Sequence, residues 1–346
     1  MSNPRLFPVD SNGRHRRQLT RLTVDGKKAP LPLKAAAIFD RGLVLTPEQA
    51  MSAAGSMRVG VVGNSGTGSL VAELLVRAGF GEVVLFDFDH TDIANLNRVL
   101  HSRMIDAEKK SLKSARLKEA LDELGMPTII TVVPGGDIRN ESVAAELRRC
   151  DAIVGCVDNS DWARLIMTEV SYQYLIPYID IGTEIGVGEN HIQSLDSRVS
   201  YLRPDRPCLL CSGLISLERV RLEGLASEEL QRVLAMGYAK NRTLTAPAVM
   251  DLNMRAASYG VLVLRHLLQP FLDMPLPTHI IEPDPETRDA TETGTQQGTS
   301  FAVRDGVITL VDLRHDFVRD KICPFVVCPV FFHAVFWVKE YDNERA

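Results

Sequence analysis

The sequence predicts an α/β fold: a doubly wound, mostly parallel, Rossmann-like sheet with an added antiparallel C-terminal part. Three observations predict it. Apolar strands and amphipathic helices alternate between residues 58 and 181. A turn with three glycines joins the first of these strands to the first helix, and Asp87 ends the second strand about 20 residues later.

The alternating elements can be placed in order from their apolar patterns. Short apolar runs of the kind found in buried parallel strands predict strands at 59–62, 83–86, 128–133, 152–157 and 178–181. Apolar residues at helical spacing predict helices at 69–78, 111–124, 141–149 and 162–174. Sequential strand–helix units of this length favour a parallel sheet covered by helices on both faces.

The pattern changes after about residue 186. Short strands are predicted at 187–193 and 198–202, a polar helix at 217–234 and a long helix at 248–268. The long helix carries small residues, Ala256, Ala257, Ser258 and Gly260, which allow close packing against a neighbour. Strands at 300–303 and 307–311 predict a hairpin, and the polar stretch 284–299 predicts a loop. We therefore divide the chain into an N-terminal arm (1–50), a nucleotide-binding half (51–185) and a substrate-binding half (186–346).

Composition limits the classes of partner. Hydrophobic residues make up 45% of the chain and the formal net charge is −5, so nothing in the bulk charge favours nucleic acid or an anionic membrane. The most apolar run, 325–338, contains Pro329 and His333 and is shorter than the roughly 20 residues of a membrane-spanning helix. The first ten residues lack the apolar stretch of a secretory signal, so we expect a cytoplasmic protein whose six cysteines are thiols or metal ligands.

The glycine turn, Gly63-Asn64-Ser65-Gly66-Thr67-Gly68, predicts a phosphate-binding loop. Glycines without side chains let backbone N–H groups approach a phosphate, and the following helix adds partial positive charge. Asp87 stands where a carboxylate usually binds ribose hydroxyls. These features fit NAD as well as ATP, and a glycine turn can also serve tight packing alone.

Charged residues further along the chain favour ATP. Asn95-Leu96-Asn97-Arg98 is followed by Lys109, Lys110 and Lys113, and a later strand ends in Cys156-Val157-Asp158-Asn159. Hydride transfer develops no new phosphate charge, whereas adenylation of a carboxylate does, and pyrophosphate departs. Cations and a metal-binding carboxylate at the strand ends would serve adenylation, although Lys109 and Lys110 taken singly read as solvated surface charges.

Taken in order, these motifs resemble those of the ThiF/MoeB/HesA family, which activates ubiquitin-like and sulfur-carrier proteins. The resemblance extends from about residue 39 to residue 268. It is carried by the glycine turn with Ser69, the motifs around Asp87, Arg98 and Asp158, Tyr178-Ile179-Asp180-Ile181-Gly182, and Pro207-Cys208-Leu209-Leu210-Cys211. One departure is Ser65, which stands where a glycine is common in the family.

The resemblance implies a role for each motif. Gly63, Gly66, Gly68 and Ser69 would hold the phosphates of ATP, and Asp87 the ribose. Asn95, Asn97 and Arg98 would belong to the same nucleotide site, and Asp158 would hold Mg²⁺. Lys113 fits the phosphate-binding lysine better than Lys110. An arginine from the N-terminal arm would complete the site, often across a dimer interface, and we prefer Arg41 over Arg14 or Arg17.

The cysteines leave two interpretations open. Cys208 and Cys211 have the spacing of half a tetrahedral zinc site, and the resemblance implies that Cys323 and Cys328 complete it. The alternative is four buried thiols that pack as small apolar groups. Because Cys150 and Cys156 lie in predicted core positions, a zinc site would leave no cysteine for a thioester, and the acyl group would pass directly to a partner.

The resemblance therefore implies ATP-dependent adenylation of the C-terminal carboxylate of a small ubiquitin-like or sulfur-carrier protein. Downstream partners would be a conjugating or sulfur-transfer enzyme, and the chain would form a homodimer. Three alternatives remain: adenylation of a small-molecule or tRNA-nucleoside carboxylate, a non-catalytic half of a heterodimeric activating enzyme, and an NAD-dependent oxidoreductase.

Overall fold

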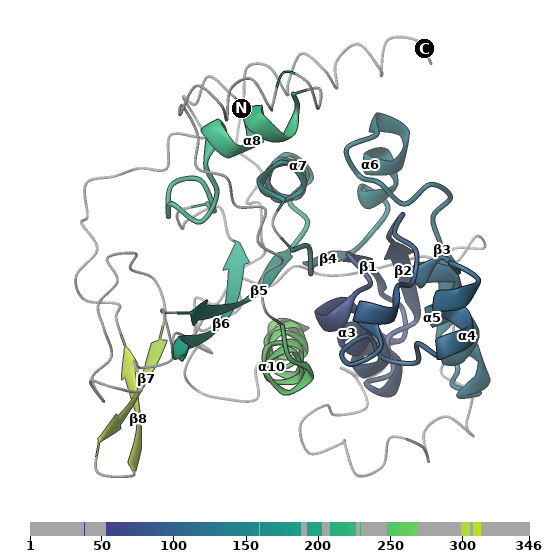
Figure 1. Cartoon of the computed structure of the whole chain (residues 1–346), viewed down its shortest axis with the longest axis horizontal. Helices are drawn as coiled ribbons and strands as arrows, with labels where there is room; N and C mark the ends of the chain where they lie inside the picture. The colour runs from purple at the N-terminus through teal and green to yellow at the C-terminus, as the bar shows by residue number, and fades with distance from the viewer. Residues whose placement is uncertain are drawn as a thin grey trace.

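The computed structural model describes residue 38 and residues 53–158, 160–187, 192–202, 208–225, 229, 248–268, 299–304 and 307–312. Within these residues a six-stranded sheet lies at the centre, with helices on both of its faces (Figure 1). The predicted doubly wound α/β fold is confirmed. Apart from Ile38, the predicted N-terminal arm lies outside the described residues.

The sheet has the strand order β3-β2-β1-β4-β5-β6. Its strands are β1 (Arg58–Val62), β2 (Glu82–Phe86), β3 (Ile129–Val132), β4 (Ala152–Gly155), β5 (Tyr178–Val187) and β6 (Ile192–Leu202). The first five are parallel, and β6 runs antiparallel to β5. The chain runs outward from β1 to β3 and then returns to place β4 on the other side of β1. The loops after β1 and β4 therefore flank the point where strand order reverses, where open α/β sheets bind their ligands.

Helices fill both sides of this sheet. On one side lie α3 (Gly66–Arg77), α5 (Lys113–Glu123) and α10 (Met250–Leu268), and on the other lie α6 (Glu141–Leu147) and α7 (Asp161–Tyr174). The remaining elements are η2 (Ile93–Asn95), α4 (Met104–Glu108), α8 (Leu217–Glu223), β7 (Thr299–Arg304) and β8 (Val307–Asp312). Alternate residues of each strand enter the two hydrophobic clusters, as Val61 and Val62 of β1 do.

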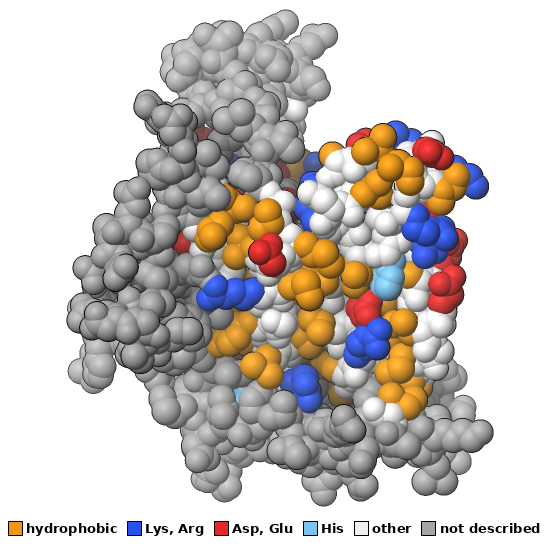
Figure 2. Space-filling view, turned by 60° about the horizontal axis from the view of Figure 1, so that its bottom comes forward, with side chains coloured by type: hydrophobic (Ala, Val, Ile, Leu, Met, Phe, Trp, Pro, Cys, Tyr) orange, Lys and Arg blue, Asp and Glu red, His pale blue; other side chains and the backbone are white. Residues whose placement is uncertain are grey.

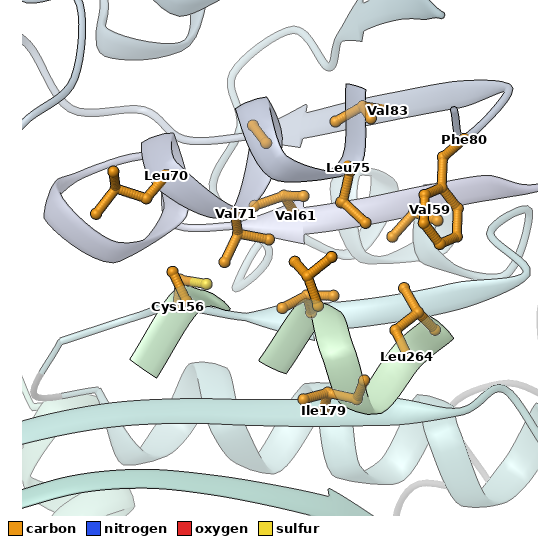
Figure 3. Close-up of a cluster of buried hydrophobic side chains, with 14 of the residues drawn as sticks. Val59, Val61, Leu70, Val71, Leu75, Phe80, Val83, Cys156, Ile179 and Leu264 are labelled. Atoms are coloured by element: carbon orange, nitrogen blue, oxygen red, sulfur yellow. The ribbon is translucent and has the colours of Figure 1, made fainter. Parts of the chain in front are cut away.

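The larger hydrophobic cluster joins β1 and α3 to α10, which lies much later in the sequence (Figure 3). Val59 and Val61 of β1 meet Leu70, Val71 and Leu75 of α3, at spacings that place these three side chains on one helical face. Side chains of α10, among them Leu264, pack against the same cluster. The first helix after the glycine turn is therefore held in place by a helix almost 200 residues later in the chain.

The small residues of α10 pack within the chain. Ala256 and Ala257 are buried in the larger cluster. A side chain at Gly260 would overlap Ile181 of β5. The neighbours against which these small residues pack are therefore elements of the same chain, and the expected homodimer rests on the family resemblance alone.

Two element boundaries predicted from the sequence were wrong. Residues 192–202 form one continuous strand that pairs along β5, rather than two short strands at 187–193 and 198–202. The residues between the two predicted strands, 194–197, hide this strand in the sequence because Asp196 and Ser197 are polar, although Ser197 is buried in the structure. Helix α8 ends at Glu223 with Gly224 as its C-cap, well short of residue 234. Glycine is a poor helix former, and residues 230–247 lie outside the described residues.

The predicted C-terminal hairpin is confirmed, since β7 and β8 pair antiparallel. Of the predicted loop 284–299, residues 284–298 lie outside the described residues, as does the apolar run 325–338, whereas Thr299 is the first residue of β7. Among the described helices, none combines the length and apolar character needed to cross a membrane. On the face shown in Figure 2, the described basic side chains stand apart from one another, with acidic and apolar side chains between them. This face gives no support to a nucleic-acid partner.

Candidate nucleotide and metal site

The candidate site lies where the carboxyl ends of β1, β2 and β4 meet. The glycine turn leaves β1 at Gly63, Asp87 follows β2, and Asp158 follows β4. Helix α3 begins at Gly66, so the second half of the predicted turn forms the first turn of this helix. Its N-cap, Ser65, makes no side-chain capping hydrogen bond. The N-terminal amides of α3 are thus available to an anion rather than to their own cap.

Each glycine of the turn is required by a different contact. Gly63 has a φ of 84°, in the left-handed region that favours glycine. A side chain at Gly68 would overlap the carbonyl oxygen of Gly63, and one at Gly66 would overlap the amide group of Asn253 on α10. Ser65 has a φ of −87°, so this position does not need the left-handed backbone that favours glycine.

Asp87 is buried and fixes the turn to the second strand. Its carboxylate accepts hydrogen bonds from the backbone N–H groups of Asn64 (2.5 Å) and Asp89 (2.7 Å). Burial raises the pKa of Asp87, and these hydrogen bonds together with the charge of Lys113 oppose the rise. A carboxylate has about four acceptor positions, so it can accept further hydrogen bonds from ribose hydroxyls.

The loop after Asp87 brings two cations toward the turn. Lys113 is the first residue of α5, its side chain is 7% exposed, and its Nζ lies 2.9 Å from the Asp89 carboxylate. Arg98 follows η2, and its aliphatic stem lies beside Gly66, because a Cβ added there would be 3.5 Å from Arg98 Cγ. Ser69 connects α3 to this loop, since its hydroxyl accepts a 3.0 Å hydrogen bond from the N–H of Leu100.

Asn95 and Asn97 also hold the loop together. The side-chain oxygen of Asn95 accepts a hydrogen bond from the N–H of Asp92 at 3.0 Å. Arg98 Nη1 donates to the carbonyl of Ala94 at 2.5 Å and to Asn97 Oδ1 at 3.2 Å. The Lys110 ammonium lies at the surface, where it pairs with the exposed carboxylate of Asp92 at 2.6 Å. The structure therefore separates Lys110 from Lys113, which lies in the interior of the site.

Asp158 is a carboxylate on which these cations act electrostatically. It is exposed to solvent, yet enough protein surrounds it to raise the pKa of its carboxyl by desolvation. The positive charges of Arg164, Arg98 and Lys113 oppose this rise. Arg98 and Lys113 thus act electrostatically on Asp158, although separate motifs predicted them, and Arg98 also lies beside Gly66 of the turn.

A buried ionic network supports the loop that carries Asp158. Arg164 of α7 donates to the carbonyl of Val157 at 3.0 Å and pairs with Asp180 of β5 at 3.3 Å. Asp180 is fully buried and also pairs with Arg198 at 2.7 Å and accepts a hydrogen bond from the Tyr178 hydroxyl at 2.8 Å. Sequence reasoning missed both arginines, although two arginines among apolar strand and helix residues are a signal of a buried acidic partner.

Asn253 is a second residue that sequence reasoning missed. It is 3% exposed, its amide group lies against Gly66, and its Oδ1 accepts a 3.1 Å hydrogen bond from the Thr183 hydroxyl. The sequence could have indicated Asn253, because it is a single amide side chain between Leu252 and Ala256 on the buried face of α10. Asn253 thus connects β5, α10 and the first turn of α3.

We predict that Asn253→Ala lowers the free energy of unfolding by about 1–3 kcal/mol, because it leaves the Thr183 hydroxyl without its partner. Thr183→Val removes the hydroxyl that donates this hydrogen bond. Denaturant unfolding of the two single variants and of the double variant then gives the interaction energy between the two side chains by a double-mutant cycle. Additive losses in the double variant would show that the two side chains do not interact.

The structure describes one of the two predicted cysteine pairs. Cys208 is buried, Cys211 is exposed, and the N–H of Cys211 donates to Cys208 Sγ at 3.4 Å. Within the described residues, no group of three or more potential metal-binding side chains is present. Cys323 and Cys328 lie outside the described residues, as do Arg14, Arg17 and Arg41. Cys150 and Cys156 are buried, as predicted, and burial raises the pKa of Cys150 to about 12.

Solved structures with the same fold include E. coli MccB with selenomethionine MccA, at a TM-score of 0.55 and 14% identity, covering 85% of this chain and 76% of that one. Selenomethionine PaaA matches at a TM-score of 0.51 and 15% identity, covering 72% of this chain and 69% of that one. At these identities the likeness concerns the fold.

Relatives are also found by sequence. Ubiquitin-like modifier-activating enzyme 5 of Caenorhabditis briggsae is 29% identical over 205 residues, which are 54% of this chain and 45% of the relative. The enzyme of the same name from Rattus norvegicus is 26% identical over 181 residues, or 50% of this chain and 44% of the relative. The chain spans less than half the length of these curated relatives. The model of the ThiF family matches residues 39–249, more than half of the 346 residues, and the chain belongs to this family.

Proposed function

We propose that this chain uses ATP to adenylate the C-terminal carboxylate of a small ubiquitin-like or sulfur-carrier protein, with release of pyrophosphate. The observation that carries the proposal is the position of Arg98. It lies beside the first turn of α3, and its charge and that of Lys113 act on Asp158. Membership of the ThiF family and the names of the similar enzymes support the same activity.

The nucleotide would bind across the point where the strand order reverses. The uncapped first turn of α3 would accept the phosphates, and Asp87 would bind the ribose hydroxyls. Asn95, Asn97 and Ser69 would act mainly by fixing the loop that carries Arg98, because their described hydrogen bonds go to the protein backbone and to Arg98 itself.

The chemical step is attack by a carboxylate oxygen of the carrier on the α-phosphorus of ATP. A new C–O–P linkage forms, the bond to the pyrophosphate oxygen breaks, and pyrophosphate leaves with the electron pair. Arg98 and Lys113 would neutralise the negative charge that develops on the phosphates, and Arg41 is proposed to add a third cation from the N-terminal arm. Positioning of the carboxylate and ATP next to each other would supply much of the remaining rate enhancement.

Mg²⁺ fits the site beside these cations. Asp158 presents an exposed carboxylate, and hard divalent cations prefer such oxygen ligands. Asp158 would hold the metal, which when bound would polarise the phosphates and offset their charge. The chain's own contribution is to keep the Asp158 loop in place, through the hydrogen bond from Arg164 to the Val157 carbonyl.

Zinc is a separate proposal. Cys208 and Cys211 have the CxxC spacing of half a structural site, and Cys323 and Cys328 are proposed to complete it. The N–H···S hydrogen bond to Cys208 Sγ is the kind of contact that stabilises a thiolate ligand. If zinc occupies these four thiols, the adenylate would pass to a thiol or amine on a partner enzyme, because Cys150 and Cys156 are buried.

ATP–pyrophosphate exchange tests the proposed function directly. Purified protein is incubated with ATP, Mg²⁺, labelled pyrophosphate and candidate carriers that end in a free carboxylate. We expect label to enter ATP only when a matching carrier is present, and a carrier with an amidated C-terminus is the control. Absence of exchange with every carrier, combined with thermal protection by NAD and none by ATP, would instead support the oxidoreductase alternative.

A further inference from the structure

Helix α7 begins at Asp161, shortly after Asp158 in the sequence. A side chain from α8 accepts hydrogen bonds from the first N–H groups of α7. Glu223 Oε1 accepts a hydrogen bond from the N–H of Asp161 at 2.7 Å. Its Oε2 accepts hydrogen bonds from the N–H of Trp162 at 3.2 Å and from the Ser160 hydroxyl at 2.8 Å. Ser160 in turn caps the N–H of Ala163 at 3.2 Å. Glu223, which is 62 residues after Asp161, and Ser160 therefore together satisfy the N–H groups of Asp161, Trp162 and Ala163.

The contact between the two helices is reciprocal. Asp161, in the first turn of α7, accepts a hydrogen bond from the N–H of Ser216, the N-cap of α8, at 2.7 Å. The same carboxylate pairs with Arg219 of α8. At the other end of α8, Gly224 lies against the indole of Trp162. The segment that follows the CxxC pair is thus fastened to the beginning of α7 at both of its ends.

This arrangement has a consequence for Asp158. The first N–H groups of a helix attract carboxylates, and a residue just before the N-cap can turn back to bind them. Asp158 lies two residues before the N-cap Ser160. Glu223 already occupies two of those donors, the Asp158 carboxylate is exposed, and the charges of Arg98 and Lys113 act on it.

We propose that Glu223 is a positioning residue for the metal site: by capping α7 it keeps the Asp158 carboxylate available for Mg²⁺. The proposal rests on the proposed function, because it takes Asp158 as the metal ligand. On this proposal α8, which follows the CxxC pair, helps to hold the loop that carries Asp158. The role belongs to the Glu223 carboxylate itself rather than to the docking of α8 in general.

The test compares three variants of the full chain. Glu223→Gln removes the charge that caps α7. Glu218→Gln makes the same change on the same helix at an exposed position. Arg219→Gln breaks a contact between α8 and α7 but leaves the N–H groups of α7 occupied. Calorimetry with a non-hydrolysable ATP analogue measures the affinity with and without Mg²⁺, and so gives the part of the affinity that depends on the metal.

We expect Glu223→Gln to reduce the gain in affinity on adding Mg²⁺ by about fivefold to tenfold, with the metal-free affinity unchanged. Glu218→Gln and Arg219→Gln should keep the wild-type gain. Hydrogen exchange supplies a readout without any metal, since the amides of residues 161–163 should exchange faster in Glu223→Gln alone.

Other results would overturn the proposal. An unchanged gain in Glu223→Gln, or an equal loss in Arg219→Gln, would mean that the Glu223 carboxylate has no specific role. A fall in the metal-free affinity of Glu223→Gln would indicate a merely structural contribution. Failure of the proposed function is seen separately, as a wild-type protein that binds the Mg²⁺ complex of the analogue normally but exchanges no pyrophosphate with any carrier.

Discussion

Replacing Arg98 by glutamine should slow ATP–pyrophosphate exchange by about 10²–10³-fold, the usual cost of removing one group that stabilises transition-state charge. Arg98 lies beside Gly66 at the start of α3 and acts electrostatically on Asp158. Its described hydrogen bonds are confined to its own loop, to Ala94 and Asn97. The charge is therefore positioned for a ligand, and its loss should affect catalysis far more than folding.

A matched control for Arg98 lies at the opposite end of α3. Arg77 is in the last turn of this helix, its side chain is 55% exposed, and it pairs with Glu73. Arg77→Gln should leave the exchange rate within about twofold of wild type, since a surface ion pair contributes at most about 1 kcal/mol. Equal losses of exchange in the two variants would mean that Arg98 supports the fold rather than the reaction.

Replacing Asp180 by asparagine should lower the free energy of unfolding by about 3–5 kcal/mol, the range found when one partner of a buried ion pair is removed. Asp180 is fully buried between Arg164 and Arg198, whose side chains are 13% and 16% exposed. The neutral variant leaves both guanidinium groups without their counter-charge inside the protein. Denaturant unfolding at neutral pH measures the loss, and Asp122→Asn, at an exposed pair with Lys118, should change stability by less than about 1 kcal/mol.

The same variant gives a pH dependence with a defined sign. Burial alone would raise the pKa of Asp180, but the charges of Arg164 and Arg198 and the Tyr178 hydroxyl lower it overall. A lowered folded-state pKa contributes stability above the ordinary aspartate pKa of about 3.9, and this contribution is lost as the pH falls through the folded value. The stability difference between wild type and Asp180→Asn should therefore shrink below about pH 4. A difference that stays constant with pH would contradict the charge assignment.

The sheet could be predicted because its strands depend on local patterns. Short apolar runs such as Val59–Val62 are buried on both faces and need no partner to be recognised. Strand β6 was predicted only as two short pieces, because Asp196 and Ser197 are polar and the burial of Ser197 depends on pairing with β5. Helix α8 was predicted too long because a single glycine, Gly224, ends it.

The candidate site was predicted where residues sit at motif spacings along the chain. Gly63 follows β1, Asp87, Arg98 and Lys113 follow β2, and Asp158 follows β4, and a parallel sheet brings such positions to one edge. Asn253, Arg164 and Glu223 were missed because they act on the site through contacts that only folding creates. Residues of this kind hold the loops, whereas those found from the sequence are the ones proposed to bind the nucleotide and the metal.

Oxygen isotope transfer tests the central claim, carboxylate adenylation, most directly. A carrier with ¹⁸O in its C-terminal carboxylate is incubated with the protein, ATP and Mg²⁺, and the acyl-adenylate is then cleaved by hydroxylamine at the carbonyl carbon. The bridging oxygen leaves with AMP, so mass spectrometry should find one ¹⁸O in each AMP produced. AMP that contains no ¹⁸O while ATP is consumed would mean that water attacks the nucleotide, and would contradict carboxylate adenylation.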